Sequence, residues 1–148
     1  MPAALATSGY SGKPLAAKLG LKDGMVAAFV ALPASLEALA EAVDFASFDR
    51  PGDWAGIGGA VRKYDFAHAF TFQRTEIENH LADLQEAIKS DGTIWVSWPK
   101  KTSRVATDVT EDVVRTEALK LDLVDVKVAA VDEVWSGLKL VIRKERRT

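Results

Sequence analysis

Short apolar runs alternate with segments of helical periodicity along this chain, and that alternation is the strongest constraint on how it folds. The longer runs have the length and residue types of buried strands, and they fall at residues 25–32, 66–72, 93–98 and 124–131. A shorter run at 45–48 is a candidate for one more strand. Strands that alternate with helices form a mostly parallel sheet with helices on both faces.

The first two helices are marked by residues that start and stop helices. One helix is expected from Ser11, with Pro14 near its first turn, to a stop at Gly20. Another is expected over residues 35–43 because apolar side chains recur there at helical spacing, and Ser35 is the predicted cap.

Two later helices have clearer starting signals. Thr75 and Glu78 have the spacing of a capping box, and an apolar stripe follows them until Asp91-Gly92 ends the predicted helix. Thr110 is the predicted cap of the last helix. Glu111 and Asp112 then fall in its first turn, where the helix dipole favours negative charge.

The chain closes with two strand-like segments, Val124–Val131 and Leu138–Arg143, joined by a connection short enough for a hairpin. The predicted fold is a single three-layer, Rossmann-like α/β domain whose mostly parallel sheet ends in an antiparallel C-terminal hairpin. This order of elements is reminiscent of Rossmann-like methyltransferases, which is an analogy about fold. Residues 1–10 are small and polar and are expected to form a flexible arm before the domain, residues 11–148.

Composition excludes several classes of protein. The net charge of −2 gives no overall field that attracts nucleic acid, and the absence of cysteine excludes disulfides and thiolate metal sites. No apolar run reaches the roughly 18 residues of a membrane span, and the N-terminus lacks a signal-peptide pattern. A cytoplasmic protein without nucleic-acid or membrane partners is therefore expected.

Distinctive motifs in the last third carry a resemblance to a known family. They are Trp98-Pro-Lys-Lys101, Thr107-Asp-Val-Thr-Glu-Asp-Val-Val-Arg115, Val124-Asp-Val-Lys-Val128 and Val131-Asp-Glu-Val-Trp-Ser-Gly-Leu-Lys139. With Gly9-Tyr-Ser-Gly-Lys-Pro-Leu15 near the start, the chain resembles the bacterial family called domain of unknown function 3052. The resemblance spans nearly the whole chain and implies a bacterial cytoplasmic protein of this fold, but no particular activity or catalytic residue.

The expected place for a cofactor lacks its usual residues. Enzymes that bind S-adenosylmethionine or a dinucleotide on such a fold normally have a glycine-rich turn after the first strand. Here that turn, residues 30–36, has no glycine, and Asp49, where a ribose ligand is expected, is interpreted more simply as a turn residue. The cofactor therefore stays unknown. His68 and His80 have no partner at metal-ligand spacing, so no metal site is predicted.

The loop after the run 93–98 is rich in polar side chains. Open α/β sheets bind ligands outside the carboxyl ends of their strands, and this loop leaves such an end. The predicted ligand site consists of Arg74, Lys100, Lys101, Ser103, Arg104 and Thr107. Arginine and lysine suit a phosphate or carboxylate, and a solvated basic loop is the alternative interpretation.

Three hypotheses about function follow. The first is a non-catalytic binding or regulatory domain that holds a small anionic ligand or a protein segment at this cleft. The alternative is a divergent S-adenosylmethionine-dependent methyltransferase-like enzyme. The third is a protein–protein interaction module, for example a homodimer with Trp135 as its interface anchor, although core packing also explains a tryptophan there.

Trp95 and Trp98 are three residues apart on one strand and should face opposite sides of the sheet.

Overall fold

One six-stranded sheet organises the computed structural model, which describes residues 12–147. The strand order is β2-β1-β3-β4-β6-β5. The strands are β1 (Val26–Val30), β2 (Ser47–Asp49), β3 (Tyr64–Phe70), β4 (Ile88–Pro99), β5 (Leu123–Ala130) and β6 (Trp135–Ile142). Strands β1 to β4 run parallel, and β6 lies antiparallel between β4 and β5. The expected arm, residues 1–10, lies outside the described part of the chain.

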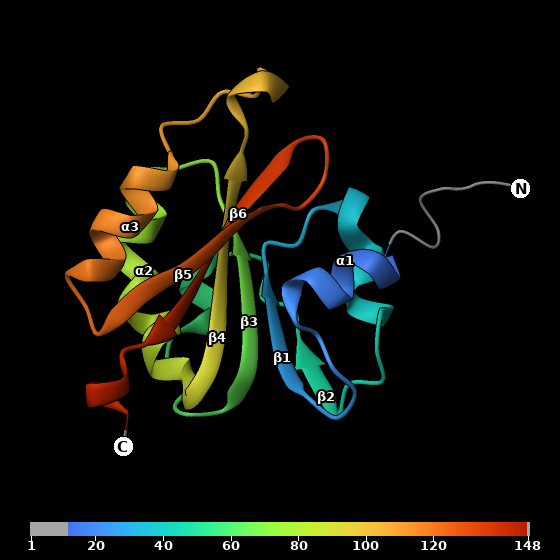
Figure 1. The fold of residues 1–148 in the computed structure, drawn as a ribbon, viewed down its shortest axis with the longest axis vertical. Coiled ribbons are helices and arrows are strands. Elements are labelled where there is room, and N and C mark those ends of the chain that lie inside the picture. Colours follow the sequence, from blue (N-terminus) through green and yellow to red (C-terminus); the bar gives the residue numbers. More distant parts are fainter. Residues whose placement is uncertain (1–11, 148) are drawn as a thin grey trace, which may run out of the picture.

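Helices cover both faces of this sheet, as Figure 1 shows. The α-helices are α1 (Gly12–Leu19), α2 (Arg74–Ala87) and α3 (Glu111–Leu119), and the short 3-10 helices are η1 (Ala34–Glu41), η2 (Trp54–Ile57), η3 (Lys101–Ser103) and η4 (Lys144–Arg146). Helices α2 and α3 lie on one face, and α1 lies with η1 on the other (Figure 1). The predicted three-layer α/β fold with an antiparallel C-terminal hairpin is therefore confirmed.

Two apolar cores lie on opposite sides of the sheet. The stripe of α2, including Ile77, Leu81 and Leu84, packs in one core. Trp98 belongs to this core and Trp95 to the other, so the prediction that these rings face opposite sides is confirmed. The indole N–H of Trp95 donates to the carbonyl of Leu19 at 2.9 Å, which joins the end of α1 to the sheet.

The start of α2 differs from the prediction. The capping residue is Gln73, so Thr75 lies inside the helix and forms no capping box with Glu78. A carboxylate from a distant loop acts instead, because Oδ1 of Asp108 accepts from the backbone N–H of Arg74 at 2.7 Å. A partner 34 residues away satisfies this free donor, which local spacing does not reveal.

Two other boundaries also depart from the sequence pattern. The helix expected over 35–43 is the 3-10 helix η1, which follows Pro33 and has no side-chain cap, so Ser35 is not its cap. Helix α2 ends at Ala87, and Asp91-Gly92 lies within β4 rather than ending the helix. A Cβ at Gly92 would lie 3.0 Å from the carbonyl oxygen of Tyr64, so glycine permits a close backbone approach at this irregular point of the β3–β4 pairing.

Other local signals are confirmed. The hydroxyl of Thr110 accepts from the N–H of Val113 at 3.2 Å and caps α3. Gly20 follows α1 with a φ of 86°, the left-handed conformation that glycine adopts without strain.

His68 is a fully buried polar side chain in the middle of β3. Its Nε2 lies 2.8 Å from Oγ of Ser97 on β4, and its ring stacks on Phe70 with centroids 4.1 Å apart. The other ring nitrogen has no hydrogen-bond partner. Burial disfavours the charged imidazolium and lowers the pKa of His68 from its ordinary 6.5 to about 3. His68 is thus a neutral core residue.

We expect His68 to make the free energy of unfolding depend on pH. The unfolded chain binds a proton below pH 6.5 and the native chain does not, so stability present above that pH is lost as the pH falls toward 3. The loss should approach about 1.4 kcal/mol per pH unit. His68→Gln keeps a nitrogen near Ser97 but does not titrate, so urea unfolding at pH 7, 6 and 5 should show a shallower decline than in the wild type. His80→Gln, on the surface of α2, is the control, and an equal flattening in both variants would contradict this assignment.

Candidate functional site

The strand order reverses at the centre of the sheet, between β1 and β3. The chain passes from β1 to β2 on one side and then returns to place β3 on the other side of β1. Because the helices that follow β1 and β3 leave in opposite directions, a crevice forms outside the carboxyl ends of these strands. Ligands of open α/β sheets bind at such a crevice.

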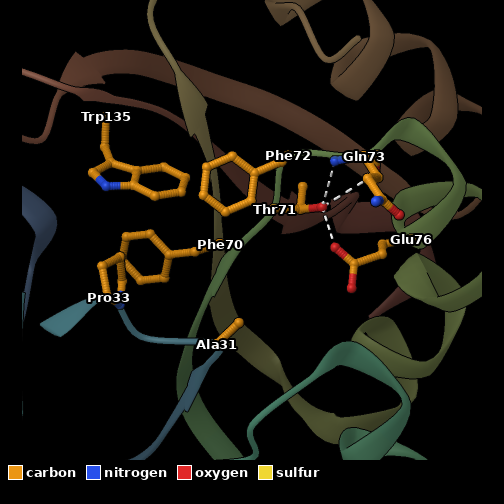
Figure 2. A pocket seen from close by; sticks show the side chains of 8 residues that line it. All are labelled: Ala31, Pro33, Phe70, Thr71, Phe72, Gln73, Glu76 and Trp135. Carbon is orange, nitrogen blue, oxygen red and sulfur yellow. Dashed lines mark hydrogen bonds between the residues drawn. The ribbon is translucent and has the colours of Figure 1, made fainter. Parts of the chain in front are cut away.

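A pocket of about 340 Å³ lies at this point. We call it the switch-point pocket, and its lining residues are Ala31, Pro33, Phe70, Thr71, Phe72, Gln73, Glu76 and Trp135. Figure 2 shows the rings of Phe70, Phe72 and Trp135 grouped together, with Glu76 across from them. The pocket thus combines residues that follow β1 and β3 with the first residue of β6.

The aromatic part of the pocket is held firmly. Phe72 is 46% exposed, whereas Phe70 and Trp135 are buried. The ring of Trp135 lies 5.3 Å from that of Phe70 at an angle of 89°, and 5.1 Å from that of Phe72 at 58°. Phe70 in turn stacks on the buried ring of His68. Such inclined pairs are favourable arrangements of aromatic rings, so these faces have fixed positions.

The polar part is built around Thr71, which is buried at the end of β3. Its hydroxyl oxygen accepts from the backbone N–H of Gln73 at 3.0 Å, and the hydroxyl also bonds to the carboxylate of Glu76. Glu76 is the single ionisable side chain among the pocket's lining residues. Within residues 12–147 it has no ion-pair partner. Thr71 therefore orients a carboxylate that lies in the first turn of α2 and forms no side-chain ion pair in the described part of the chain.

The backbone of the turn after β1 is hydrogen-bonded within the protein. Ala31 has a φ of 57°, a left-handed conformation that is strained for any residue with a side chain. Its backbone N–H donates to the carbonyl of Pro51 at 2.9 Å, and Pro33 then leads into η1. This N–H is therefore engaged and does not point freely toward a ligand, as a glycine-rich turn would allow.

Asp49, at the end of β2, is also engaged. Nζ of Lys63 lies 2.9 Å from Oδ2 of Asp49, and the hydroxyl of Tyr64 donates to the same oxygen at 2.6 Å. These bonds, first that of Lys63 and then that of Tyr64, lower the pKa of Asp49. The β1 turn and Asp49 thus do not offer the ordinary contacts of an adenosyl cofactor.

The predicted ligand residues lie elsewhere, and the structure gathers part of them. A second pocket of about 600 Å³ lies beyond the end of β4, and Lys100, Lys101, Arg104 and Thr107 line it with Trp98 and Thr110. We call it the basic pocket. Among the residues that the structure describes, none of its three cations forms an ion pair. The structure therefore brings three of the predicted basic side chains and Thr107 together at one pocket.

Two predicted ligand residues do not line the basic pocket. Arg74 pairs with Glu78 one turn along α2, with Nε 3.0 Å from Oε2. Ser103 donates from its hydroxyl to the carbonyl of Lys100 at 2.6 Å, so it shapes the loop. Thr107 lines the pocket, but its hydroxyl also donates to the carbonyl of Phe72 at 2.7 Å, which ties this loop to the end of β3.

Trp135 occupies a different position from the one expected. It begins β6, opposite Pro99 on β4, instead of lying in the hairpin connection. It is only 4% exposed, and its ring packs against Phe70 and Phe72. The exposure on which the interface hypothesis relied is absent, and core packing with a face toward the switch-point pocket describes this residue. The sequence prediction missed this pocket, for which Phe70 and Phe72, two residues apart at the end of the predicted strand 66–72, were the available signal.

Neither membrane nor metal features are found in the part of the chain that the structure describes. None of the helices within residues 12–147 combines the length and apolar character needed to cross a bilayer. No set of three or more His, Cys, Asp or Glu side chains in this range is placed to hold a metal ion.

Comparisons with known proteins place the fold. No family model matches the chain, and no curated protein matches it in sequence. A solved methyltransferase from Aquifex aeolicus superposes with a TM-score of 0.62 at 14% identity, covering 89% of each chain. Magnesium protoporphyrin IX methyltransferase from Synechocystis, solved with bound S-adenosylmethionine, gives 0.61 at 15% identity over 91% of this chain and 80% of the other. A TehB-like methyltransferase from Corynebacterium glutamicum gives 0.61 at 10% identity, covering 90% and 88%. The chain therefore has the Rossmann-like fold of S-adenosylmethionine-dependent methyltransferases.

We predict that the basic pocket attracts anions. With citrate at fixed ionic strength, the wild-type melting temperature should rise, because Lys100 and Lys101 add favourable charge interactions with the anion. The double variant Lys100→Ala/Lys101→Ala should lose that rise but keep its circular dichroism. Lys127→Ala/Lys144→Ala removes the same net charge away from the pocket and should keep the rise. An equal citrate response in all three proteins would show that these lysines form a solvated surface.

Proposed function

We propose that the protein is a divergent methyltransferase-like enzyme whose small-molecule ligand, S-adenosylmethionine or a related adenosyl compound, occupies the switch-point pocket. The observation that carries this proposal is the place of the pocket. It lies at the carboxyl ends of β1 and β3, where the strand order reverses and where open α/β folds bind their ligands. The structural neighbours support the enzyme hypothesis better than the non-catalytic, anion-binding one, because methyltransferases recur among them.

The divergence concerns which residues hold the ligand. In this chain the β1 turn contacts Pro51 and Asp49 contacts Lys63, so neither offers its usual contact. Phe72 and Trp135 offer flat apolar faces instead, and stacking of a nucleobase on an aromatic side chain contributes about 1–3 kcal/mol. Bound S-adenosylmethionine would supply an activated methyl group, and the chain would supply stacking, orientation and partial exclusion of water.

Membership of the family called domain of unknown function 3052 is part of the proposal. Two of the motifs that carry this resemblance, around Trp98-Pro99 and Trp135-Ser136, are strand partners at the ends of β4 and β6. The backbone N–H of Lys100 also donates to the carbonyl of Val134 at 2.7 Å. This pairing places the motifs between the switch-point pocket and the basic pocket, and both pockets include residues from them. If both motifs contribute to one ligand site, that shared role gives a physical reason for their distinctive residues.

Calorimetric titration with S-adenosylmethionine and S-adenosylhomocysteine tests this function. We expect saturable binding of at least one compound to the wild type, and Phe72→Ala should weaken it about tenfold because one stacking face is lost. Phe48→Ala removes a similarly exposed ring outside the pocket and should leave the affinity unchanged. If neither compound binds at millimolar concentration, or if both variants weaken binding equally, the proposed function is wrong.

A further inference from the structure

The charge of the switch-point pocket is unusual for a nucleotide or acid site. Its lining includes one carboxylate, from Glu76, and no basic side chain. Two of the backbone donors beside it are also engaged: Arg74 N donates to Asp108, and Glu76 N donates to the carbonyl of Gln73 at 3.2 Å. An anion placed here would meet the negative charge of Glu76, which forms no ion pair within residues 12–147, and neither of these two donors would be free to bind it. The pocket therefore disfavours anions.

The aromatic rings add to the same preference. The faces of aromatic rings carry negative electrostatic potential, which attracts a cation placed over them, and tryptophan is the most effective. Phe70 ends β3, Phe72 lies two residues beyond it and Trp135 begins β6. Their rings meet at steep angles, so their surfaces form a corner rather than a flat wall. Glu76 lies across the pocket from that corner (Figure 2). This combination of inclined aromatic faces and one carboxylate is the chemistry that binds methylated ammonium groups.

The arrangement is also fixed before any ligand arrives. Phe70 stacks on His68, and the backbone N–H of Trp135 donates to Oδ1 of Asp132 at 2.6 Å. The hydroxyl of Thr71 holds the carboxylate of Glu76. A pocket whose groups already have their positions loses less conformational entropy when it binds a ligand.

We infer that the switch-point pocket selects an organic cation, a sulfonium or methylated ammonium group, and holds it between the aromatic corner and the carboxylate of Glu76. This inference rests on the proposed function in placing the ligand in that pocket. It goes further because it makes the positive charge, rather than the adenosine, the feature that the chain recognises. A sulfonium ligand should therefore bind more tightly than its neutral thioether.

Two matched pairs of ligands test the inference by calorimetry. S-adenosylmethionine and S-adenosylhomocysteine differ in the sulfonium methyl group and its charge, and choline and 3,3-dimethylbutan-1-ol have the same shape with and without charge. In each pair the cation should bind about tenfold more tightly. Glu76→Gln keeps an acceptor for Thr71 but removes the charge, so it should reduce this ratio several-fold and leave the neutral ligand's affinity unchanged. Glu78→Gln, two positions along α2 and outside the pocket, should retain the full ratio.

The outcomes separate the inference from the proposed function. Equal binding of the two adenosyl compounds, with no preference for choline, would overturn the inference and leave the adenosyl proposal standing. A choline preference that depends on Glu76, without binding of either adenosyl compound, would support the inference and overturn the adenosyl proposal. No binding of any of the four ligands would overturn both.

Discussion

Strand β3 is the element on which the rest of the structure depends. It pairs with β1 and β4 at the centre of the sheet, and its side chains enter both cores. Its last residue, Phe70, accepts a hydrogen bond from the indole of Trp54 at 2.8 Å through its carbonyl and stacks on His68 through its ring. Because the next residues are Thr71 and Phe72, a strand fixed in this way also fixes both parts of the switch-point pocket.

The sheet and its layers were predictable from the sequence because periodicity reports burial. Apolar runs and helical stripes identify which faces of the elements are buried. The alternation of strands with helices along the chain predicts that neighbouring strands pair in parallel. Helix ends were less predictable where the partner is distant. Thr110 caps α3 within its own turn, so the sequence predicts this cap correctly. The start of α2 depends on the distant Asp108, so the local pattern wrongly predicts Thr75 as its cap. Gly92 has the pattern of a helix stop, but it lies within β4 and permits a close backbone approach to β3.

The candidate sites show the same difference between local and long-range information. Lys100, Lys101 and Arg104 belong to one loop, so their proximity follows from the chain itself. Arg74 was expected to join them, but Glu78 lies one helical turn away and pairs with it instead. The switch-point pocket needs Trp135 to reach Phe70 and Phe72 across the sheet, and that contact depends on the position of β6 beside β4. Residue types alone do not specify such a pairing.

The turn after β1 has no glycine, and the polar groups that face the crevice lie after β3 instead. Ala31 keeps the left-handed conformation of a tight turn, but its N–H contacts Pro51, so this side closes on itself. The polar group available to a ligand in the crevice is then on the β3 side, where the hydroxyl of Thr71 orients the carboxylate of Glu76. A backbone N–H favours negative groups, whereas a carboxylate beside aromatic faces favours positive ones. In the arrangement we propose, ligand recognition on the β3 side instead of the β1 side reverses the charge that the crevice prefers. One fold would then keep its ligand position while selecting a different kind of ligand group.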